Sequence, residues 1–180
     1  MVEVLPQSLI LPGDILCYEG HSLISTLIRF KTWSDHISHV EMANSPVSAL
    51  ASRDGKGVAT YGIDLDPKRL YAVYRSRFPL DMTAVRTLHV KCVGQKYDVW
   101  GLFRFFTWGK QSLDKQFCSE YVVRLLREGV HAKEQNFDPF FNFCDADLIP
   151  PGHLPYSPGL WCVCQREKDL KYYVPESLAS

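Results

Sequence analysis

The chain has 180 residues, of which 46% are hydrophobic and 22% are charged, and its 20 basic residues balance its 20 acidic residues. This length and composition predict a single globular domain over residues 1–180 with a substantial core. The charge balance provides no basic excess, so neither nucleic acid nor an anionic membrane is expected as a partner. The N-terminal segment MVEVLPQSLILPGD lacks the features of a signal peptide, and no stretch approaches the roughly 18 apolar residues that a membrane span requires. We therefore expect a cytoplasmic protein without a stable membrane anchor, although a phage-encoded or shortened chain would show the same pattern.

Turn residues and apolar periodicity predict a strand-rich first half. Pro12-Gly13-Asp14 is typical of a turn that Asp14 stabilises, and residues 15–18 are typical of a strand. Apolar residues at helical spacing predict a helix over 22–31. Asp54-Gly55 predicts a hairpin turn. Further strands are expected over residues 37–43, 47–52, 57–63 and 70–75.

The second half is expected to be mainly helical. Residues 81–94 and 98–106 have the spacing of amphipathic helices. A third helix is predicted to start at Cys118, with apolar residues four, seven and eight positions later, so that the thiol faces the protein body. Gly129 is the expected helix end, and the Pro-rich tail is expected to finish in one strand. Helices that flank an antiparallel sheet make an α+β fold.

The six cysteines do not have the spacing of a small disulfide framework, and a chain of this length does not need cross-links, so we expect free thiols. Cys162 and Cys164 form a C-x-C motif, with Cys144 and His153 upstream. A zinc site is an alternative, but the motif lacks the usual gap of two to four residues between ligands. Because alternate residues of a strand share a face, we expect two packed core thiols and no bound metal.

Cys118 and His39 are the candidate catalytic pair. Cys118 opens the helical segment FCSEYVVRLLREG, and His39 lies in the strand-like segment ISHVEMAN. A helix N-terminus stabilises a thiolate, and an imidazole facing it can accept and return a proton. A lone cysteine on an apolar helix face is usually a core residue, as is a lone buried histidine. The motifs around the two residues favour the catalytic interpretation, with Cys118 as nucleophile and His39 as base.

Three further side chains are candidates for the same site. Glu41 lies two residues after His39, so both side chains leave one face of the strand, and the Glu41 carboxylate could orient the imidazole. The alternatives are a solvent-facing Glu41 and an orienting role for Ser52 on the next strand. Tyr97 could donate its hydroxyl to an oxyanion beside the backbone N–H of Cys118, unless it is an ordinary core tyrosine.

Four motifs in one order resemble a known superfamily. LPGDILCY and ISHVEMAN resemble the PGD-strand and SHV-strand pair of the NlpC-type papain-like amidases and peptidases, and GQKYD and FCSEYV resemble their Gly-x-x-Tyr segment and Cys-Ser helix start. In ordinary members the cysteine helix precedes the strands, whereas here it follows them. That order is similar to the circularly permuted YiiX-like branch and, more distantly, to the lecithin:retinol acyltransferase-like proteins. The ending DADLIPPGHLPYSPGLW also resembles the YiiX-like domain, so the resemblance spans about residues 10–164. The chain departs from many non-permuted relatives at Glu41, where they have Gly.

The resemblance implies a circularly permuted papain-like fold and a cysteine hydrolase that cleaves an amide or peptide bond without a cofactor. Cys118 would attack the carbonyl, His39 would protonate the leaving amine, and water would hydrolyse the thioester. Peptidoglycan stem peptides are the substrate class that the superfamily suggests, so a small peptide or amide is the expected partner. Two alternatives remain: a lipid acyltransferase or thioesterase of the lecithin:retinol acyltransferase-like type, and a binding module that kept the fold without catalysis.

Overall fold

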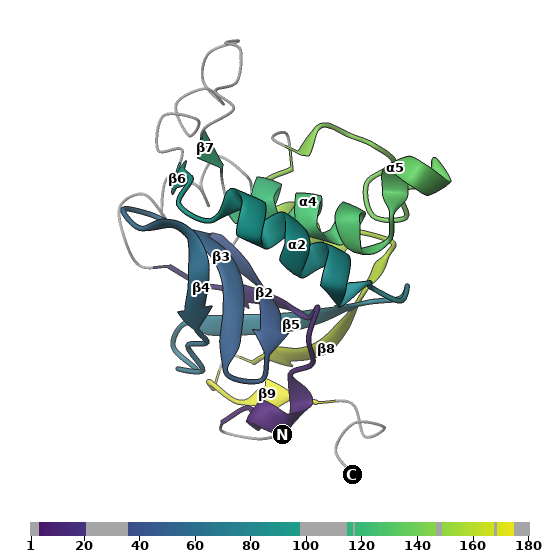
Figure 1. Cartoon of the computed structure of the whole chain (residues 1–180). Helices are drawn as coiled ribbons and strands as arrows, with labels where there is room; N and C mark the ends of the chain where they lie inside the picture. Colours follow the sequence, from purple (N-terminus) through teal and green to yellow (C-terminus); the bar gives the residue numbers. More distant parts are fainter. Residues whose placement is uncertain are drawn as a thin grey trace.

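A seven-stranded antiparallel sheet with two helices packed on one face forms the centre of the structure (Figure 1). This computed structural model describes residues 4–20, 36–97, 115–116, 118–146, 149–167 and 169–174. The strand order across the sheet is β4-β3-β2-β1-β5-β8-β9. The strands are β1 (Ile15–Tyr18), β2 (His39–Ser45), β3 (Ser48–Arg53), β4 (Gly57–Gly62), β5 (Leu70–Ser76), β8 (Leu160–Arg166) and β9 (Tyr172–Tyr173).

The remaining elements are helices and one short strand pair. The strands β6 (Lys96–Tyr97) and β7 (Lys115–Gln116) pair in parallel. The helices are α2 (Met82–Cys92), α4 (Cys118–Gly129) and the short α5 (Ala132–Gln135), with 3-10 turns η1 (Gln7–Leu9) and η3 (Pro151–Tyr156). None of the helices in the described ranges has the length and hydropathy to cross a bilayer.

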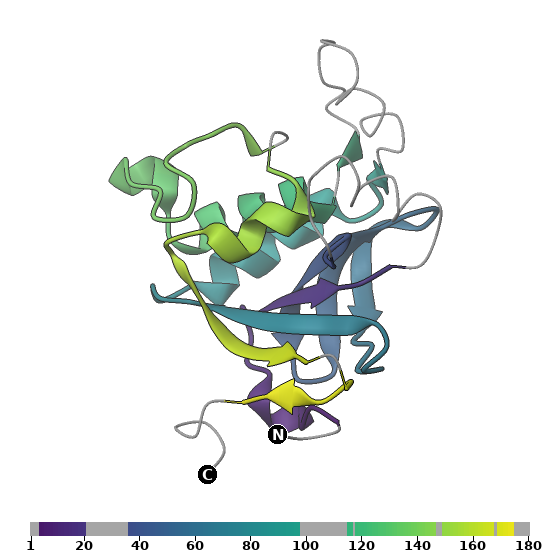
Figure 2. The ribbon, with the colours of Figure 1, turned by 180° about the vertical axis from the view of Figure 1, so that it is seen from behind.

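The central strand β1 is buried because both faces of the sheet are covered. Ile15 and Cys17 point into the core that the helices share, whereas Leu16 and Tyr18 point into a second core on the other face. The second core is completed by the N-terminal segment and by Tyr172 of β9. The purple N-terminal segment and the yellow strand β9 lie together at the bottom of Figures 1 and 2. An apolar run without alternation therefore suits β1, since neither face meets solvent.

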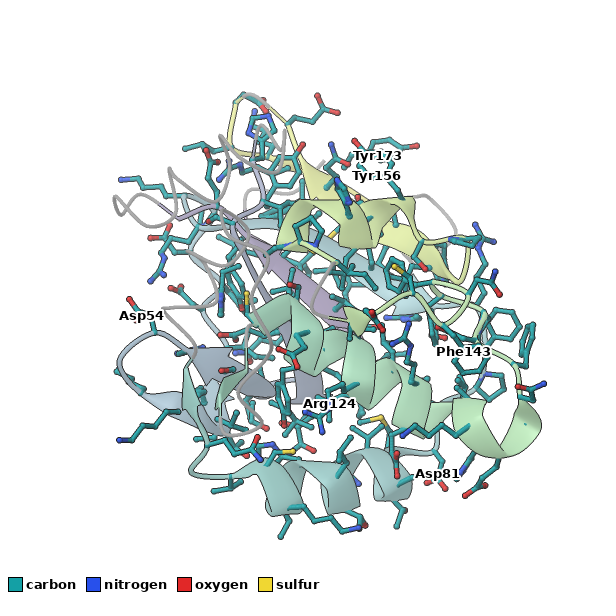
Figure 3. All side chains as sticks on the ribbon, turned by 90° about the horizontal axis from the view of Figure 1, so that it is seen from above. Asp54, Asp81, Arg124, Phe143, Tyr156 and Tyr173 are labelled. Carbon is teal, nitrogen blue, oxygen red and sulfur yellow. The ribbon has the colours of Figure 1, made fainter. Side chains whose placement is uncertain are left out.

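Helices α2 and α4 lie side by side over the first core (Figure 1). The side chain of Asp81 caps α2 by accepting hydrogen bonds from two backbone N–H groups of its first turn. In α4, the apolar residues predicted from the sequence face the sheet, and Arg124 lies between the two helices (Figure 3). Helix α4 ends at Gly129 as predicted, and a Cβ there would contact Leu80 at 3.1 Å and Val85 at 3.0 Å. The small residue therefore allows α4 to approach α2 closely.

The α+β class with an antiparallel sheet is confirmed, and so are the strand over 15–18 and the hairpin turn at Asp54-Gly55. The predicted helices over 22–31 and 98–106 lie outside the described residues. The strand expected at the end of the Pro-rich tail is confirmed as β8, and the chain then turns back and adds the short strand β9.

The prediction that Cys162 and Cys164 share one face is wrong. The register between β5 and β8 shifts between Val73 and Tyr74, so Cys164 pairs with Val73 and Cys162 pairs with Tyr74. Cys164 consequently joins the second core, whereas Cys162 packs against the first. All six cysteines are free thiols. A register shift breaks the simple alternation on which the prediction relied.

The hairpin between β3 and β4 depends on two glycines with left-handed backbone. Gly55 has φ +68° and open space around its Cα, whereas Gly57 has φ +74° and lies against the backbone oxygen of Gln95. A Cβ on Gly57 would approach that oxygen to 2.3 Å. The close contact lets Val58 donate its N–H to the Gln95 oxygen at 2.9 Å, which docks the segment before β6 onto β4.

We predict that Gly57→Ala destabilises the fold much more than Gly55→Ala. Both variants place an L-residue in left-handed backbone, which costs about 1–2 kcal/mol, but only Gly57→Ala adds the clash with Gln95, for a total of about 3 kcal/mol or more. Urea unfolding followed by fluorescence measures both free energies. Equal losses in the two variants would contradict the packing argument.

Candidate active site

The N-terminus of α4 and the start of β2 meet at one place in the structure. Cys118 is the first residue of α4, and His39 is the first residue of β2. Helix α4 packs against β2 and β3, so the sheet fixes where the helix begins. The Cys118 side chain is almost enclosed, with 1% of its surface exposed. The backbone N–H groups of Val40 and Ser119 donate hydrogen bonds to its sulfur.

A side-chain hydrogen bond joins Cys118 and His39. Burial raises the pKa of the Cys118 thiol, but the His39 imidazolium, its hydrogen bond and the two backbone N–H groups outweigh burial and hold this pKa below its usual value. Burial likewise lowers the pKa of His39, but the Cys118 thiolate and the Glu41 carboxylate outweigh burial and raise it to about 10. Both shifts therefore favour the thiolate form of Cys118 and the imidazolium form of His39.

Glu41 lies on the side of β2 predicted from its spacing. Its Oε1 atom is 2.9 Å from Nε2 of His39, and 1% of its side chain is exposed, against 24% for His39. Because Nε2 donates to Glu41, Nδ1 is the ring nitrogen left for Cys118. The alternative of a solvent-facing Glu41 is wrong. Burial raises the pKa of Glu41, but hydrogen bonds from His39 and Arg53 outweigh it and hold the carboxyl below its usual range.

Arg53, the last residue of β3, binds both oxygens of Glu41. Its Nε atom is 2.6 Å from Oε1, and its Nη2 atom is 2.9 Å from Oε2. The next residue, Asp54, lies at the rim of the molecule in Figure 3, and the half-buried Arg53 side chain, 28% exposed, reaches the buried carboxylate of Glu41. Arg53 is a site residue that was not predicted from the sequence. A buried carboxylate needs a partner of opposite charge, and this need was the signal that could have pointed to Arg53. Arg53 is a cation on the strand next to that of Glu41, at the end of β3 beside the hairpin turn.

Ser52 points away from the Glu41 side of the sheet. It pairs with Val58, and its neighbour Leu50, two residues earlier on β3, belongs to the core under the helices. Glu41 and Arg53 lie on the opposite face. The observed hydrogen bond to Nε2 of His39 therefore favours Glu41 over Ser52 as the orienting residue.

The side chain of Tyr97 lies outside the described part of the structure, but its backbone does not. Tyr97 pairs with Gln116 in the short parallel ladder of β6 and β7. Gln116 is two residues before Cys118. The ladder thus places the Tyr97 backbone beside the segment that leads into α4. A second tyrosine, Tyr18 of β1, pairs with His39, and the two ring centres are 6.0 Å apart.

Comparisons with known proteins support the fold. No family model matches the chain, and no curated protein matches it. Among solved structures, the chain is similar to the crystal structure of the metalloprotein YiiX from Escherichia coli O157:H7, with 19% identity and a TM-score of 0.61. The match covers 87% of this chain and 98% of that chain. The YiiX-like resemblance noted in the motifs is thus confirmed at the level of the fold.

We predict that iodoacetamide labels Cys118 at least roughly tenfold faster than Cys162 at about pH 6, because the pKa of Cys118 is lowered, whereas burial raises that of Cys162. Cys162 is a stringent control because it is the more exposed of the two thiols. His39→Ala should remove the preference. Mass spectrometry of digested samples taken over time measures both rates, and equal rates in the unmodified sequence would contradict the thiolate assignment.

Proposed function

We propose that the protein is a cysteine hydrolase that cleaves an amide or peptide bond, with Cys118 as nucleophile and His39 as general acid and base. The observation that carries this proposal is a continuous series of hydrogen bonds from Cys118 through His39 to Glu41 and on to Arg53. Its members have the roles of a nucleophile, a base and an orienting group.

The steps of the reaction follow from these positions. The Cys118 thiolate attacks the carbonyl carbon, and the backbone N–H of Cys118, at the start of α4, would stabilise the oxyanion. The His39 imidazolium gives its Nδ1 proton to the leaving amine, which forms the thioester. His39, now neutral, takes a proton from water as the water attacks the thioester and releases Cys118. Glu41 keeps the ring in the orientation that both proton transfers need.

Tyr97 is the proposed second contributor to oxyanion stabilisation. Its motif, GQKYD, and its backbone position beside Gln116 support this role. A tyrosine hydroxyl there would add a side-chain donor to the backbone donor at Cys118.

A circularly permuted papain-like fold is part of the proposal. Two observations support it: the cysteine helix follows the PGD-type and SHV-type strands in the chain, and the fold is similar to that of YiiX. In this arrangement the nucleophile and base lie together as in papain-type enzymes, although their order in the sequence is reversed.

The name of YiiX as a metalloprotein raises the question of a metal in this chain. Among the described residues, no group of three or more His, Cys, Asp or Glu side chains is placed to hold a metal ion. His39 and Glu41 are hydrogen-bonded to each other, and Glu41 already has both oxygens on Arg53. The described residues therefore do not fit a metal site, and no step of the proposed reaction uses a metal.

Small peptides of the peptidoglycan stem type are the proposed substrates. The support is the motif resemblance to NlpC-type amidases and peptidases. Incubation of the protein with panels of wall peptides and of acyl lipids, followed by mass spectrometry, separates the candidate functions. Cleaved peptide amide bonds are the expected result, whereas transfer or release of acyl chains would favour the lipid enzyme.

We predict that Cys118→Ser and His39→Ala each reduce turnover of the substrate so identified by about 10³-fold or more, because the two side chains act as a unit. Both variants should keep the fold, which far-UV circular dichroism checks. Near-full turnover by either folded variant would show that the chemistry lies elsewhere.

Glu41→Gln should retain the fold but lose roughly 10- to 10⁴-fold in kcat, because an amide can present the wrong partner to the imidazole N–H. Ser52→Ala is the matched comparison, since Ser52 lies on the other face of the sheet. It should stay within about threefold of the unmodified protein. A full-rate Glu41→Gln enzyme would remove Glu41 from the site.

A further inference from the structure

We propose that Arg53 is a positioning residue of the thiol site: by holding both oxygens of the Glu41 carboxylate, it fixes the orientation in which Glu41 accepts the proton of His39 and cancels the carboxylate charge. This assignment rests on the proposed function, because it assumes that Cys118 and His39 react as a pair.

The geometry of the carboxylate supports a fixed orientation. Oε1 accepts from both Nε of Arg53, at 2.6 Å, and Nε2 of His39, at 2.9 Å, whereas Oε2 accepts from Nη2 of Arg53 at 2.9 Å. A two-pronged pair of this kind prevents the carboxylate from turning about its last bond. The oxygen that faces His39 is therefore set by Arg53 on the neighbouring strand.

Arg53 is itself held by the hairpin that carries it. Its Nη2 atom donates to the backbone oxygen of Gly62 at 3.1 Å, and its guanidinium lies 4.4 Å from the centre of the Tyr61 ring. The Tyr61 hydroxyl donates in turn to the oxygen of Gly57 at 2.8 Å, which ties the ring to the start of β4. With 28% of its side chain exposed, Arg53 covers a carboxylate that has 1% exposed.

The charge of Arg53 matters because of what else faces Glu41. His39 faces it from the same strand, Tyr18 from β1 and Tyr61 from β4. Burial raises the pKa of both tyrosines, so they stay neutral around neutral pH. Arg53 supplies a permanent positive charge against the carboxylate. Its removal leaves an uncompensated negative charge near the thiol and the imidazole, which raises the pKa of each.

The test is the pH dependence of Cys118 alkylation by iodoacetamide in three variants. Arg53→Gln removes the charge and the paired donors but keeps an amide of similar length. Arg53→Lys keeps the positive charge but lacks the two parallel N–H donors of a guanidinium. Arg75→Gln is the matched control, since Arg75 binds the buried Asp14 with the same two-pronged geometry, at 2.7 and 2.8 Å.

This second pair lies in the same sheet but away from the thiol. Asp14 precedes β1 at the end opposite Tyr18, the residue that pairs with His39. Asp14 also accepts the N–H of Leu11 at 2.8 Å, which confirms the structural role predicted for it in the turn. Loss of Arg75 therefore measures what the loss of a buried clamp does to the fold alone.

We expect the alkylation midpoint of Arg53→Gln to rise by roughly 0.5 to 1.5 pH units, as one unscreened charge within about 10 Å requires. Arg53→Lys and Arg75→Gln should keep the midpoint within about 0.2 units of the unmodified protein. Thermal unfolding should show a loss of stability in both Gln variants. If Arg53→Gln and Arg75→Gln lose the same stability and the alkylation midpoint of Arg53→Gln does not move, the assignment is overturned and Arg53 is purely structural.

Failure of the proposed function gives a different result. If the unmodified protein alkylates Cys118 with the midpoint of an ordinary thiol, the thiol site itself is overturned, and Arg53 has no pair to position. If Arg53→Gln does not fold, carbon-13 NMR of the Glu41 carboxyl in the unmodified protein decides. Glu41 should stay ionised at pH values at which an ordinary glutamate is already protonated, because His39 and Arg53 lower its pKa, and protonation at the ordinary pKa of a glutamate would overturn the clamp.

Discussion

A carboxylate with almost no access to water needs hydrogen-bond donors and a compensating positive charge. In this protein the groups that stabilise the Glu41 carboxylate connect three strands of the sheet. Glu41 leaves β2, Arg53 comes from β3, and Tyr61 on β4 supports the guanidinium. An unmatched charge at this depth would take up a proton or oppose folding. The register of β2 against β3 and of β3 against β4 is therefore tied to the electrostatics of the site as well as to apolar packing.

The two covered faces of the sheet position different residues of the site. The helix-covered face positions Cys118, because α4 is held against β2 and β3 by its apolar side. The opposite face holds Glu41 and Arg53, away from the helices. His39 starts β2 where the two environments meet, so its ring can bond the thiol through one nitrogen and the carboxylate through the other. A histidine placed further along β2 would be confined to one face.

Local sequence patterns predicted the parts of this arrangement that depend on nearest neighbours. The run of apolar residues in β1, the turn at Asp54-Gly55 and the shared face of His39 and Glu41 follow from short-range rules of strand and turn geometry. The ion pair between Arg53 and Glu41 could not be predicted from these short-range rules, because it depends on the register between two strands. Cys162 and Cys164 were misplaced for the same reason, since a register shift is set by the partner strand.

Insertions and deletions are restricted in the hairpin between β3 and β4. Arg53 stands immediately before its turn, and Gly57 immediately after it carries the close contact with Gln95. Insertion or deletion of one residue in this turn would shift the register of β4 against β3, which would displace Tyr61 from Arg53 or move the docking point of the segment that leads to Tyr97. Surface hairpins usually tolerate such changes, but natural variants of this protein should keep the length of this one.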